Sequence, residues 1–440
     1  MKNPVLVFAV LAASTSLAAV PNVDQNAVTV AQDSQSRLVT VSYTLTGEPA
    51  VITVDFQTNA VANAETGWTS IGEVNFTNTT GYVNQVVPTG ARSLYWQPDK
   101  VWPDQVIDAG KFRAVVKAWA TNAPPDYCVA CLLTDEQIVQ TKGADWGIPR
   151  RRYFVSAEAV PGGVTNSMYK TEFLVLRKIP AAGVVWRMGP DTNAWGGSPV
   201  TCKVMLTQDY YMGIYEFTKK QYGLIKGTSD SGTTPMNELD VWDNVRGSRY
   251  PWPAVGEGYT NFTHDVASDS ALGRLRSRTG IDSFDIPTEA QWEYACRAGN
   301  GWFWYNQTAY ASNVSQLDVN LLKAIAWYGD NSQGASISAY IKNVGLKQPN
   351  AWGLYDMLGN VEELTLNWAG DYYPMPDSED SFVVDPKGPV TPPASNKKIW
   401  KVSNSFTAVE KTFMGRRHDV VENWNNLSAG FRVICDAVAK

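Results

Sequence analysis

Five cysteines and two histidines are the side chains in this 440-residue sequence with the greatest potential for metal or redox chemistry. Cys128 and Cys131 form a CxxC pair, but their surroundings predict a strand, in which the two α carbons would lie ~10 Å apart, too far for a disulfide. A redox-active CxxC also needs a helix N-terminus, which Cys128 lacks. Two histidines, His264 and His418, cannot form a three-histidine site.

The segment around His418 holds the other reactive combination. His418 follows Arg416 and Arg417 and precedes Asp419. An imidazole in this setting could act as a general base or contact a ligand. It could also be a surface histidine that makes an ordinary hydrogen bond, and the sequence leaves both interpretations open. The sequence contains no Walker loop, GxSxG elbow, HExxH pair or paired-carboxylate spacing.

The element that positions Cys296 is predicted to be a short helix. The segment IPTEAQWEYACRAG covers residues 286–299. Thr288 is a good N-cap, Glu289 follows it in the first turn, and apolar residues recur on one face.

Residues 19–122 are predicted to form a separate β domain. The stretches 37–45, 50–58 and 112–120 alternate apolar with polar residues and are rich in Val and Thr. Such a pattern predicts a small antiparallel β-sandwich of immunoglobulin or fibronectin type. Residues 123–168 are predicted to be a final strand and linker.

The first 18 residues have the pattern of a bacterial-type signal peptide. Lys2 is followed by an apolar run and by small residues at Ser16 and Ala18. The mature protein is therefore expected to be secreted, periplasmic or on the cell surface. No later stretch approaches the ~20 apolar residues of a membrane span. A net charge of −6 offers no basic surface for nucleic acid.

Residues 169–440 carry motifs that together resemble one family, the formylglycine-generating, sulfatase-modifying-factor group. The motifs are the helix segment 286–299, PNAWGLYDMLGNVEE at 349–363 and GFR at 430–432. The resemblance implies a C-type-lectin-like domain with little regular secondary structure and long ordered loops. The whole chain is thus expected to be α+β, with the β-sandwich preceding this domain.

The resemblance also implies structural calcium. In the family the turn containing Asn360 holds a calcium ion, and here Asn360, the Val361 carbonyl and Glu363 fall on it, with Asp330 and Asn331 as a second set. Such oxygen ligands suit a hard cation. The alternative is that Asn360 caps a turn and Glu363 pairs with a basic residue.

The cysteines of the family imply one disulfide and no catalysis. Family members bridge the helix cysteine to one just after GFR, which implies a Cys296–Cys435 bridge here. The oxidases of the family hold copper with two thiolates, and ungapped alignment puts Val409 and Met414 at those positions. No copper or iron is therefore expected.

Two functions follow from the resemblance. The first is an exported, non-catalytic recognition protein that binds an extracellular glycan, peptide or protein. The second is a formylglycine-generating oxidoreductase that modifies sulfatase cysteines. For the first, the ligand-binding residues are expected on the C-terminal loops and nearby strands: Trp368, Tyr372, Met414, Arg416, Arg417, His418 and Trp424.

Overall fold

The computed structural model describes most of the chain and divides it into two compact units. Described are residues 19–76, 78–100, 106–142, 150–189, 202–229, 232–236, 245, 266–307, 318–334, 340–370, 381–389, 393–395, 397–401, 404–421 and 428–439. The first unit comprises Met1–Ile71 and Thr79–Thr121, and the second Gly72–Asn78 and Asn122–Lys440. The predicted signal peptide, Tyr372 and Trp424 lie outside the described residues.

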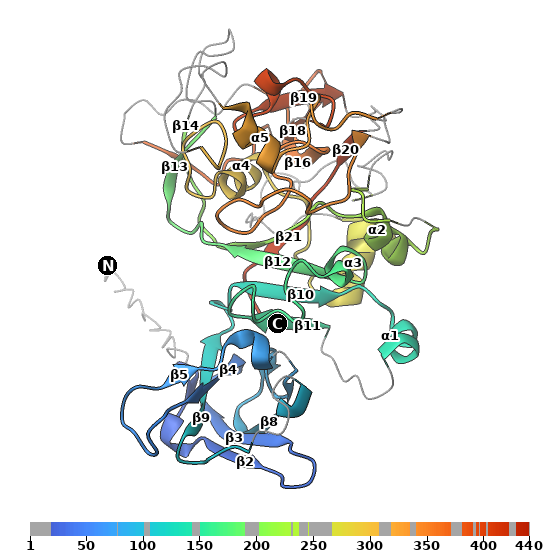
Figure 1. Cartoon of the computed structure of the whole chain (residues 1–440). Helices are drawn as coiled ribbons and strands as arrows, with labels where there is room; N and C mark the ends of the chain where they lie inside the picture. Colours follow the sequence, from blue (N-terminus) through green and yellow to red (C-terminus); the bar gives the residue numbers. More distant parts are fainter. Residues whose placement is uncertain are drawn as a thin grey trace, which may run out of the picture. The chain divides into compact units, whose positions relative to one another are not determined.

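The described residues of the first unit form two antiparallel sheets (Figure 1). The predicted strands are confirmed as β3, β4 and β9, and β4 pairs with β9 along its whole length. One sheet has the order β1 (Asn22–Val23), β3 (Val39–Thr46), β8 (Gly90–Trp96), β6 (Thr80–Gly81), with β2 (Thr29–Gln32) paired to β3. The other has the order β5 (Thr69–Ser70), β4 (Ala50–Thr58), β7 (Val86–Val87), with β9 (Phe112–Ala120) paired to β4.

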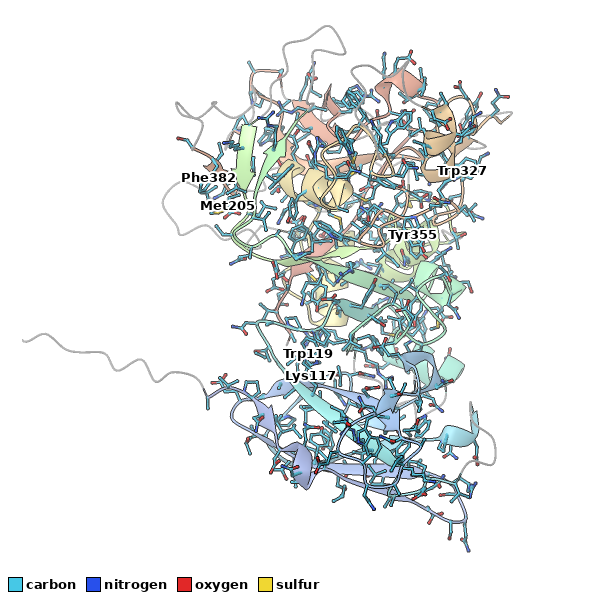
Figure 2. All side chains as sticks on the ribbon, turned by 60° about the vertical axis from the view of Figure 1, so that its left-hand side comes forward. Lys117, Trp119, Met205, Trp327, Tyr355 and Phe382 are labelled. Atoms are coloured by element: carbon cyan, nitrogen blue, oxygen red, sulfur yellow. The ribbon has the colours of Figure 1, made fainter. Side chains whose placement is uncertain are left out.

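Stacked aromatic rings join these two sheets. Phe56 lies 4.6 Å from Trp96 and 5.5 Å from Phe112, measured between ring centroids. Trp96 belongs to one sheet and the two phenylalanines to the other, so the inner faces share one apolar core. Away from that core, Lys117 lies 3.6 Å from the ring centroid of Trp119 (Figure 2).

The described residues of the second unit form three sheets. The largest has the order β11 (Arg151–Phe154), β10 (Tyr127–Cys131), β12 (Phe173–Ile179), β15 (Tyr210–Gly213), β21 (Ile434–Asp436). A second contains β13 (Val185–Met188), β14 (Cys202–Met205) and β17 (Val383–Val384). The third has the order β19 (Arg417–Val421), β18 (Lys397–Lys401), β16 (Glu362–Trp368), β20 (Ala429–Gly430). β10 and β11, which lie within the predicted final strand and linker at 123–168, join the first of these sheets and belong to the second unit.

The described helices are short and lie in the second unit. They are α1 (Asp135–Lys142), α2 (Lys219–Lys226), α3 (Ala271–Thr279), α4 (Glu289–Arg297) and α5 (Val319–Ile325). Turns of 3-10 helix occur at η1 (Gln25–Ala27), η2 (Glu73–Phe76), η3 (Pro98–Lys100), η4 (Ser167–Lys170) and η7 (Val409–Lys411). Strands thus predominate, and the predicted mixed α+β class is confirmed. Among the described helices, none combines the length and apolar character that crossing a membrane requires.

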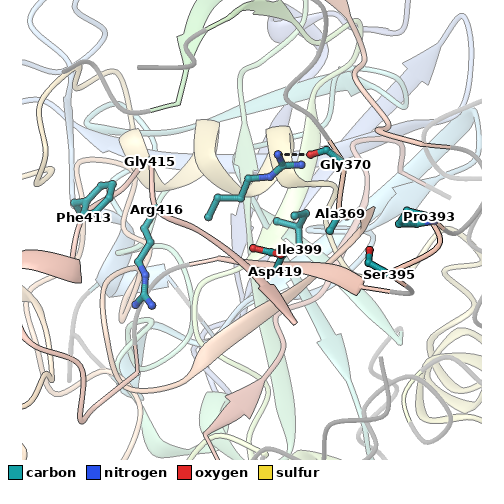
Figure 3. A pocket seen from close by; sticks show the side chains of 10 residues that line it. Ala369, Gly370, Pro393, Ser395, Ile399, Phe413, Gly415, Arg416 and Asp419 are labelled. Atoms are coloured by element: carbon teal, nitrogen blue, oxygen red, sulfur yellow. Dashed lines mark hydrogen bonds between the residues drawn. The ribbon is translucent and has the colours of Figure 1, made fainter. Parts of the chain in front are cut away.

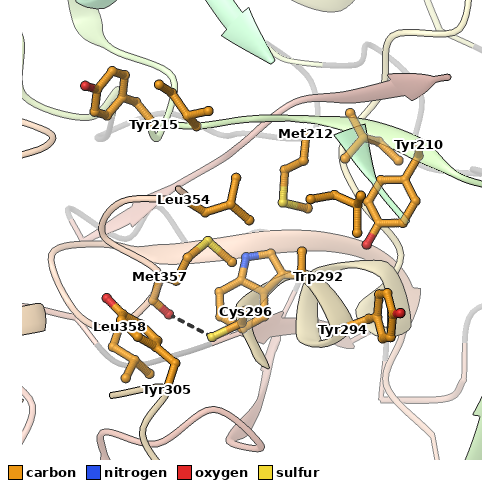
Figure 4. Packing of buried hydrophobic residues seen from close by; sticks show 14 of the residues in the cluster. Tyr210, Met212, Tyr215, Trp292, Tyr294, Cys296, Tyr305, Leu354, Met357 and Leu358 are labelled. Atoms are coloured by element: carbon orange, nitrogen blue, oxygen red, sulfur yellow. Dashed lines mark hydrogen bonds between the residues drawn. The ribbon is translucent and has the colours of Figure 1, made fainter. Parts of the chain in front are cut away.

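Helix α4 forms as predicted and is buried along its whole length. The Thr288 hydroxyl accepts from the Gln291 N–H, and the Gln291 side chain accepts from the Thr288 N–H, which completes a capping box. The helix ends at Ala298, whose φ is 46°. Trp292 and Cys296 enter the core with residues of β15 and of the 354–358 loop (Figure 4).

The predicted Cys296–Cys435 disulfide is wrong, because both residues are thiols in the structure. The Cys296 thiol donates to the Met357 carbonyl at 3.3 Å (Figure 4). Ile434 packs into the same core as Cys296, and successive strand residues point to opposite faces. Cys435 therefore lies on the other face of β21 from Cys296.

The CxxC pair is also unbridged, as predicted. Both cysteines lie within the buried strand β10. Burial raises the pKa of Cys128 to about 12, so this thiol is protonated at neutral pH and unreactive.

Candidate functional site

A cavity of about 660 Å³ lies beside the edge of the sheet formed by β16, β18 and β19 (Figure 3). We call it the Arg417 cavity. Its lining combines two arginines, one aspartate and one serine with small and apolar residues, and the complete described set is Ala369, Gly370, Pro393, Ser395, Ile399, Phe413, Gly415, Arg416, Arg417 and Asp419.

Arg417 is fixed from two sides. Its Nη1 donates to the Gly370 carbonyl at 2.8 Å (Figure 3). Its Nε lies 3.1 Å from Oε1 of Glu289, the first residue of α4. In the sheet Arg417 stands opposite Lys401 of β18, so both side chains face α4. The guanidinium therefore reaches the cavity in one held orientation.

Behind Arg417, buried charges alternate in sign, in a set that we call the ion-pair chain. Lys401 Nζ lies 3.6 Å from Glu289 Oε1 and 2.8 Å from Glu293 Oε2. Glu293 Oε1 in turn lies 2.7 Å from Arg297 Nη2. Burial would raise the pKa of Glu293, but Lys401 and Arg297 outweigh it and hold that pKa below its usual range. Glu293 is therefore ionised within the core.

The ion-pair chain ends at a second cavity, of about 490 Å³. There Arg297 Nη2 donates to the Gly189 carbonyl at 2.8 Å. The wall carries Trp186 and Tyr294, whose ring centroids are 5.3 Å apart. Buried charges thus connect the linings of two cavities through α4.

Only part of the predicted ligand-binding set meets at the Arg417 cavity. Arg416 and Arg417 line it, whereas Met414 is buried in the core. Trp368 is buried beneath Lys398, whose Nζ lies 3.4 Å from its ring centroid. His418 points to the opposite face of the sheet from Arg417.

His418 pairs with Glu362 there. Its Nδ1 lies 2.9 Å from Glu362 Oε1, so the sequence alternative of a hydrogen-bonding histidine is the one observed. Burial lowers the pKa of Arg416, and the Glu362 charge opposes that shift. In Figure 3 the Arg416 side chain extends away from the Arg417–Gly370 bond.

Sequence reasoning missed the wall formed by Gly370, Pro393, Ser395 and Ile399. These residues carry no motif, and among them only Ile399 lies in a strand, β18, where it is paired with Asp419 of β19. Strand alternation could have placed Ile399 on the same face of β18 as Lys401, but no sequence signal marks Pro393 or Ser395.

Residues 182–437 match the family described as the sulfatase-modifying factor enzyme 1-like domain. The chain belongs to this family. The predicted resemblance is thus confirmed, for more than half of the sequence.

Individual relatives of the family match shorter stretches. Chaperone protein LppX from Paenibacillus barcinonensis is 23% identical over an alignment of 203 residues, and the match covers 41% of this chain and 68% of that protein. Formylglycine-generating enzymes from Mycobacterium tuberculosis and Mus musculus are 35% and 34% identical, over 92 and 119 residues. The matches cover 20% and 24% of this chain, and only 28% and 27% of the two enzymes.

The solved structures that match include two proteins at low TM-score. Treponema denticola variable protein 1 has a TM-score of 0.42 at 20% identity, covering 60% of this chain and 95% of that one. PvdO from Pseudomonas aeruginosa has a TM-score of 0.38 at 19% identity, covering 60% and 94%.

The family's expected calcium turn is occupied by protein contacts. The Asn360 side chain donates to Glu216 at 2.7 Å and accepts from the Lys342 N–H at 2.9 Å. Glu363 accepts from Arg432 at 2.8 Å and from the Trp292 indole at 2.7 Å. A guanidinium already neutralises this carboxylate, so these side chains do not fit a calcium ion.

The second expected calcium set, Asp330 and Asn331, does not fit a calcium ion either. The Asn331 side chain accepts from the Tyr328 N–H and donates to the Ala326 carbonyl, both at 2.9 Å. Asp330 is exposed beside it. Within the described ranges, no three His, Cys, Asp or Glu side chains are grouped to hold a metal.

Removing divalent metal tests this disagreement. We expect the thermal unfolding midpoint of the full chain to be the same in chelator and in excess calcium, because Arg432 supplies the positive charge at Glu363. Scanning calorimetry in both buffers measures it. A lower midpoint in chelator, with bound calcium in elemental analysis, would contradict the expectation.

The positions aligned with the copper-binding cysteines of the family hold no thiol. Met414 is fully buried, and its N–H donates to the Phe303 carbonyl at 3.0 Å. Val409 packs partly buried against the same core. Both side chains fill space in the scaffold, and neither can ligate copper as a thiolate.

Proposed function

We propose that the second unit is an exported, non-catalytic recognition module, which binds an extracellular glycan, peptide or protein partner in the Arg417 cavity. The observation that carries this proposal is the lining itself. Its described residues offer guanidinium, carboxylate, hydroxyl and apolar groups in a concave, preformed site. Such groups bind and orient a ligand, and none of them is a thiolate.

Two further points support a binding role. Val409 and Met414 replace the cysteines that the family's oxidases need, and a relative over 203 residues is named a chaperone protein. Export rests on the N-terminal sequence pattern. The proposal includes an immunoglobulin-type topology for the first unit and a C-type-lectin-like one for the second.

Filling the cavity tests the proposal. Ser395 is exposed and lines the cavity without contributing to the ion-pair chain. Ser395→Trp is expected to abolish binding to every glycan or peptide that the full chain captures on arrays, with an unchanged unfolding midpoint. Ser167→Trp, at an exposed position that does not line the cavity, is the matched control and should bind normally.

Two results would contradict the proposal. One is array binding that survives Ser395→Trp for every ligand. The other is conversion of a CxPxR-type sulfatase peptide to formylglycine by the protein with copper and oxygen, seen by mass spectrometry. That conversion would favour the alternative, a formylglycine-generating oxidoreductase.

A further inference from the structure

We propose that the second cavity, beside β13 and the end of α4, is a further binding site, and that it accepts an aromatic side chain carried by an extended peptide. This site is separate from the Arg417 cavity, so it goes beyond the function proposed there and does not depend on it. The described lining comes from residues 184–189, around β13, and from 294–301, at the end of α4. These two elements are in contact in the second unit (Figure 1).

Two aromatic rings from different elements line the cavity. Trp186 belongs to β13 and Tyr294 to α4, with ring centroids 5.3 Å apart and ring planes at 51°. Tyr294 is held in place, because its hydroxyl donates to the Pro180 carbonyl at 2.9 Å and its ring centroid lies 5.2 Å from that of Trp352. Aromatic rings prefer such tilted or edge-to-face contacts. A further ring that enters the cavity can therefore make contacts of the same kind with rings already in position.

Polar side chains in this lining are engaged by the protein itself. Arg297 Nη2 lies 2.7 Å from Glu293 Oε1 and donates to the Gly189 carbonyl at 2.8 Å, so this guanidinium is paired. The Asn300 amide donates to two backbone carbonyls at 3.0 and 3.2 Å, and its oxygen accepts from a backbone N–H at 2.7 Å. An anion or a hydroxyl-rich sugar would have to compete for these groups, whereas an apolar ring needs no hydrogen-bond partner. The lining therefore favours an aromatic ring.

Gly301 keeps part of the cavity open. Its φ lies outside the left-handed region, so its backbone conformation does not require glycine. A Cβ atom added at this position would meet no other atom within 4 Å, so close packing does not require glycine either. The missing side chain instead leaves room in the lining, which a site for a bulky group needs.

Apolar surface continues from the cavity along the adjoining chain. Val184 lines the cavity with 42% of its surface exposed, and the next residue, Val185, is 46% exposed. A free aromatic molecule would leave this surface uncovered, whereas the residues that flank an aromatic side chain in a peptide can pack against it. The cavity volume of about 490 Å³ lies within the usual range of ligand pockets. The occupant is therefore an aromatic residue of a peptide.

Titration calorimetry of the full chain with matched peptides tests this site. The probes are blocked pentapeptides of sequence Thr-Val-X-Val-Thr, in which X is Trp, Tyr or Phe, with Ala at X as the counterpart. We expect at least one aromatic peptide to bind about tenfold or more tightly than the alanine peptide, which is the scale of burying an aromatic side chain. N-acetyltryptophanamide, a single blocked residue, should bind more weakly than the tryptophan peptide. Maltotriose, a neutral sugar probe, should bind more weakly than every aromatic peptide.

Two variants in the lining and two matched controls locate the effect. Gly301→Trp fills the cavity, and Val184→Lys places a charge in its apolar part. Each should weaken binding of the aromatic peptides about tenfold or more, with an unchanged unfolding midpoint. Ser167→Trp and Val139→Lys make the same changes at exposed positions that do not line the cavity, and both should bind normally.

Ser395→Trp separates the two cavities. It fills the Arg417 cavity and should leave binding of the aromatic peptides unchanged. Loss of that binding in Ser395→Trp, but not in Gly301→Trp or Val184→Lys, would place the peptide in the Arg417 cavity and overturn the second site.

Other results would also overturn this site without touching the function proposed for the Arg417 cavity, which is tested through Ser395. Equal affinity for the aromatic and alanine peptides, or no binding of any pentapeptide at millimolar concentration, would show that the cavity does not select an aromatic side chain. N-acetyltryptophanamide bound as tightly as the tryptophan peptide would show a site for a free ring. Maltotriose bound more tightly than the peptides, and lost in Gly301→Trp, would show a sugar site.

Discussion

Replacing Glu293 with glutamine is expected to lower the free energy of unfolding by about 3 to 5 kcal/mol, the usual effect of breaking a buried ion pair. Glu293 is fully buried between Lys401 and Arg297. Without its charge, the two cations face each other with Glu289 as the remaining carboxylate of the chain. Denaturant unfolding, followed by tryptophan fluorescence, measures the loss.

The double variant Glu293→Gln with Lys401→Met should recover part of that loss. It removes one charge of each sign, so the remaining buried charges are better balanced. Glu410→Gln, at an exposed position, is the matched control and should change the unfolding free energy by less than about 0.5 kcal/mol. A double variant less stable than Glu293→Gln alone would contradict this account of the chain.

Replacing Asp356 with asparagine is expected to stabilise the protein above pH 7 by about 2 kcal/mol. Burial raises the pKa of Asp356 to about 6, although the Gly345 N–H and Arg432 act to lower it. The backbone there has φ 54°, a left-handed conformation that asparagine tolerates. The hydrogen bond from the Gly345 N–H, 2.6 Å, can be kept by the amide oxygen.

The sign of the pH dependence follows from linkage. The folded protein holds the Asp356 proton at pH values where the unfolded chain has lost it, because the folded pKa lies above the usual aspartate value of 3.8. Its contribution to stability is therefore fully present below the unfolded pKa and declines as pH rises towards about 6. Unfolding free energies of wild type and Asp356→Asn between pH 4 and 8 should converge at the acid end. Parallel curves would contradict this pH dependence. Asp282→Asn, at an exposed position, is the control.

Local sequence rules predicted elements whose cause is local. The cap at Thr288 starts α4, and period-two alternation places β4 and β9. Long-range pairing was harder to foresee. The family pattern implied Cys435 as the partner of Cys296, whereas the register of β21 turns Ile434 inward instead.

In the candidate site, too, some residues could be predicted from the sequence and others depended on the tertiary structure. Arg416 and Arg417 were predicted from their positions near the C-terminus, and both line the cavity. Whether neighbouring strand residues share a face depends on where the strand begins, so Arg417 and His418 could not be separated from sequence alone. Glu363 was correctly given an alternative basic partner, but the identity of Arg432 needed the tertiary fold.

Helix α4 holds its charged residues at intervals of four, with Glu289, Glu293 and Arg297 along one side. The helix segment that contains these residues is also the most recognisable motif of the sequence. The buried ion pairs explain why charged residues occupy these positions of α4. No catalytic role is needed to explain them. A sequence search based on this helix would therefore find proteins that share these buried ion pairs, whatever their functions. Differences in what such proteins bind or transform should be sought in the loops beside Arg417.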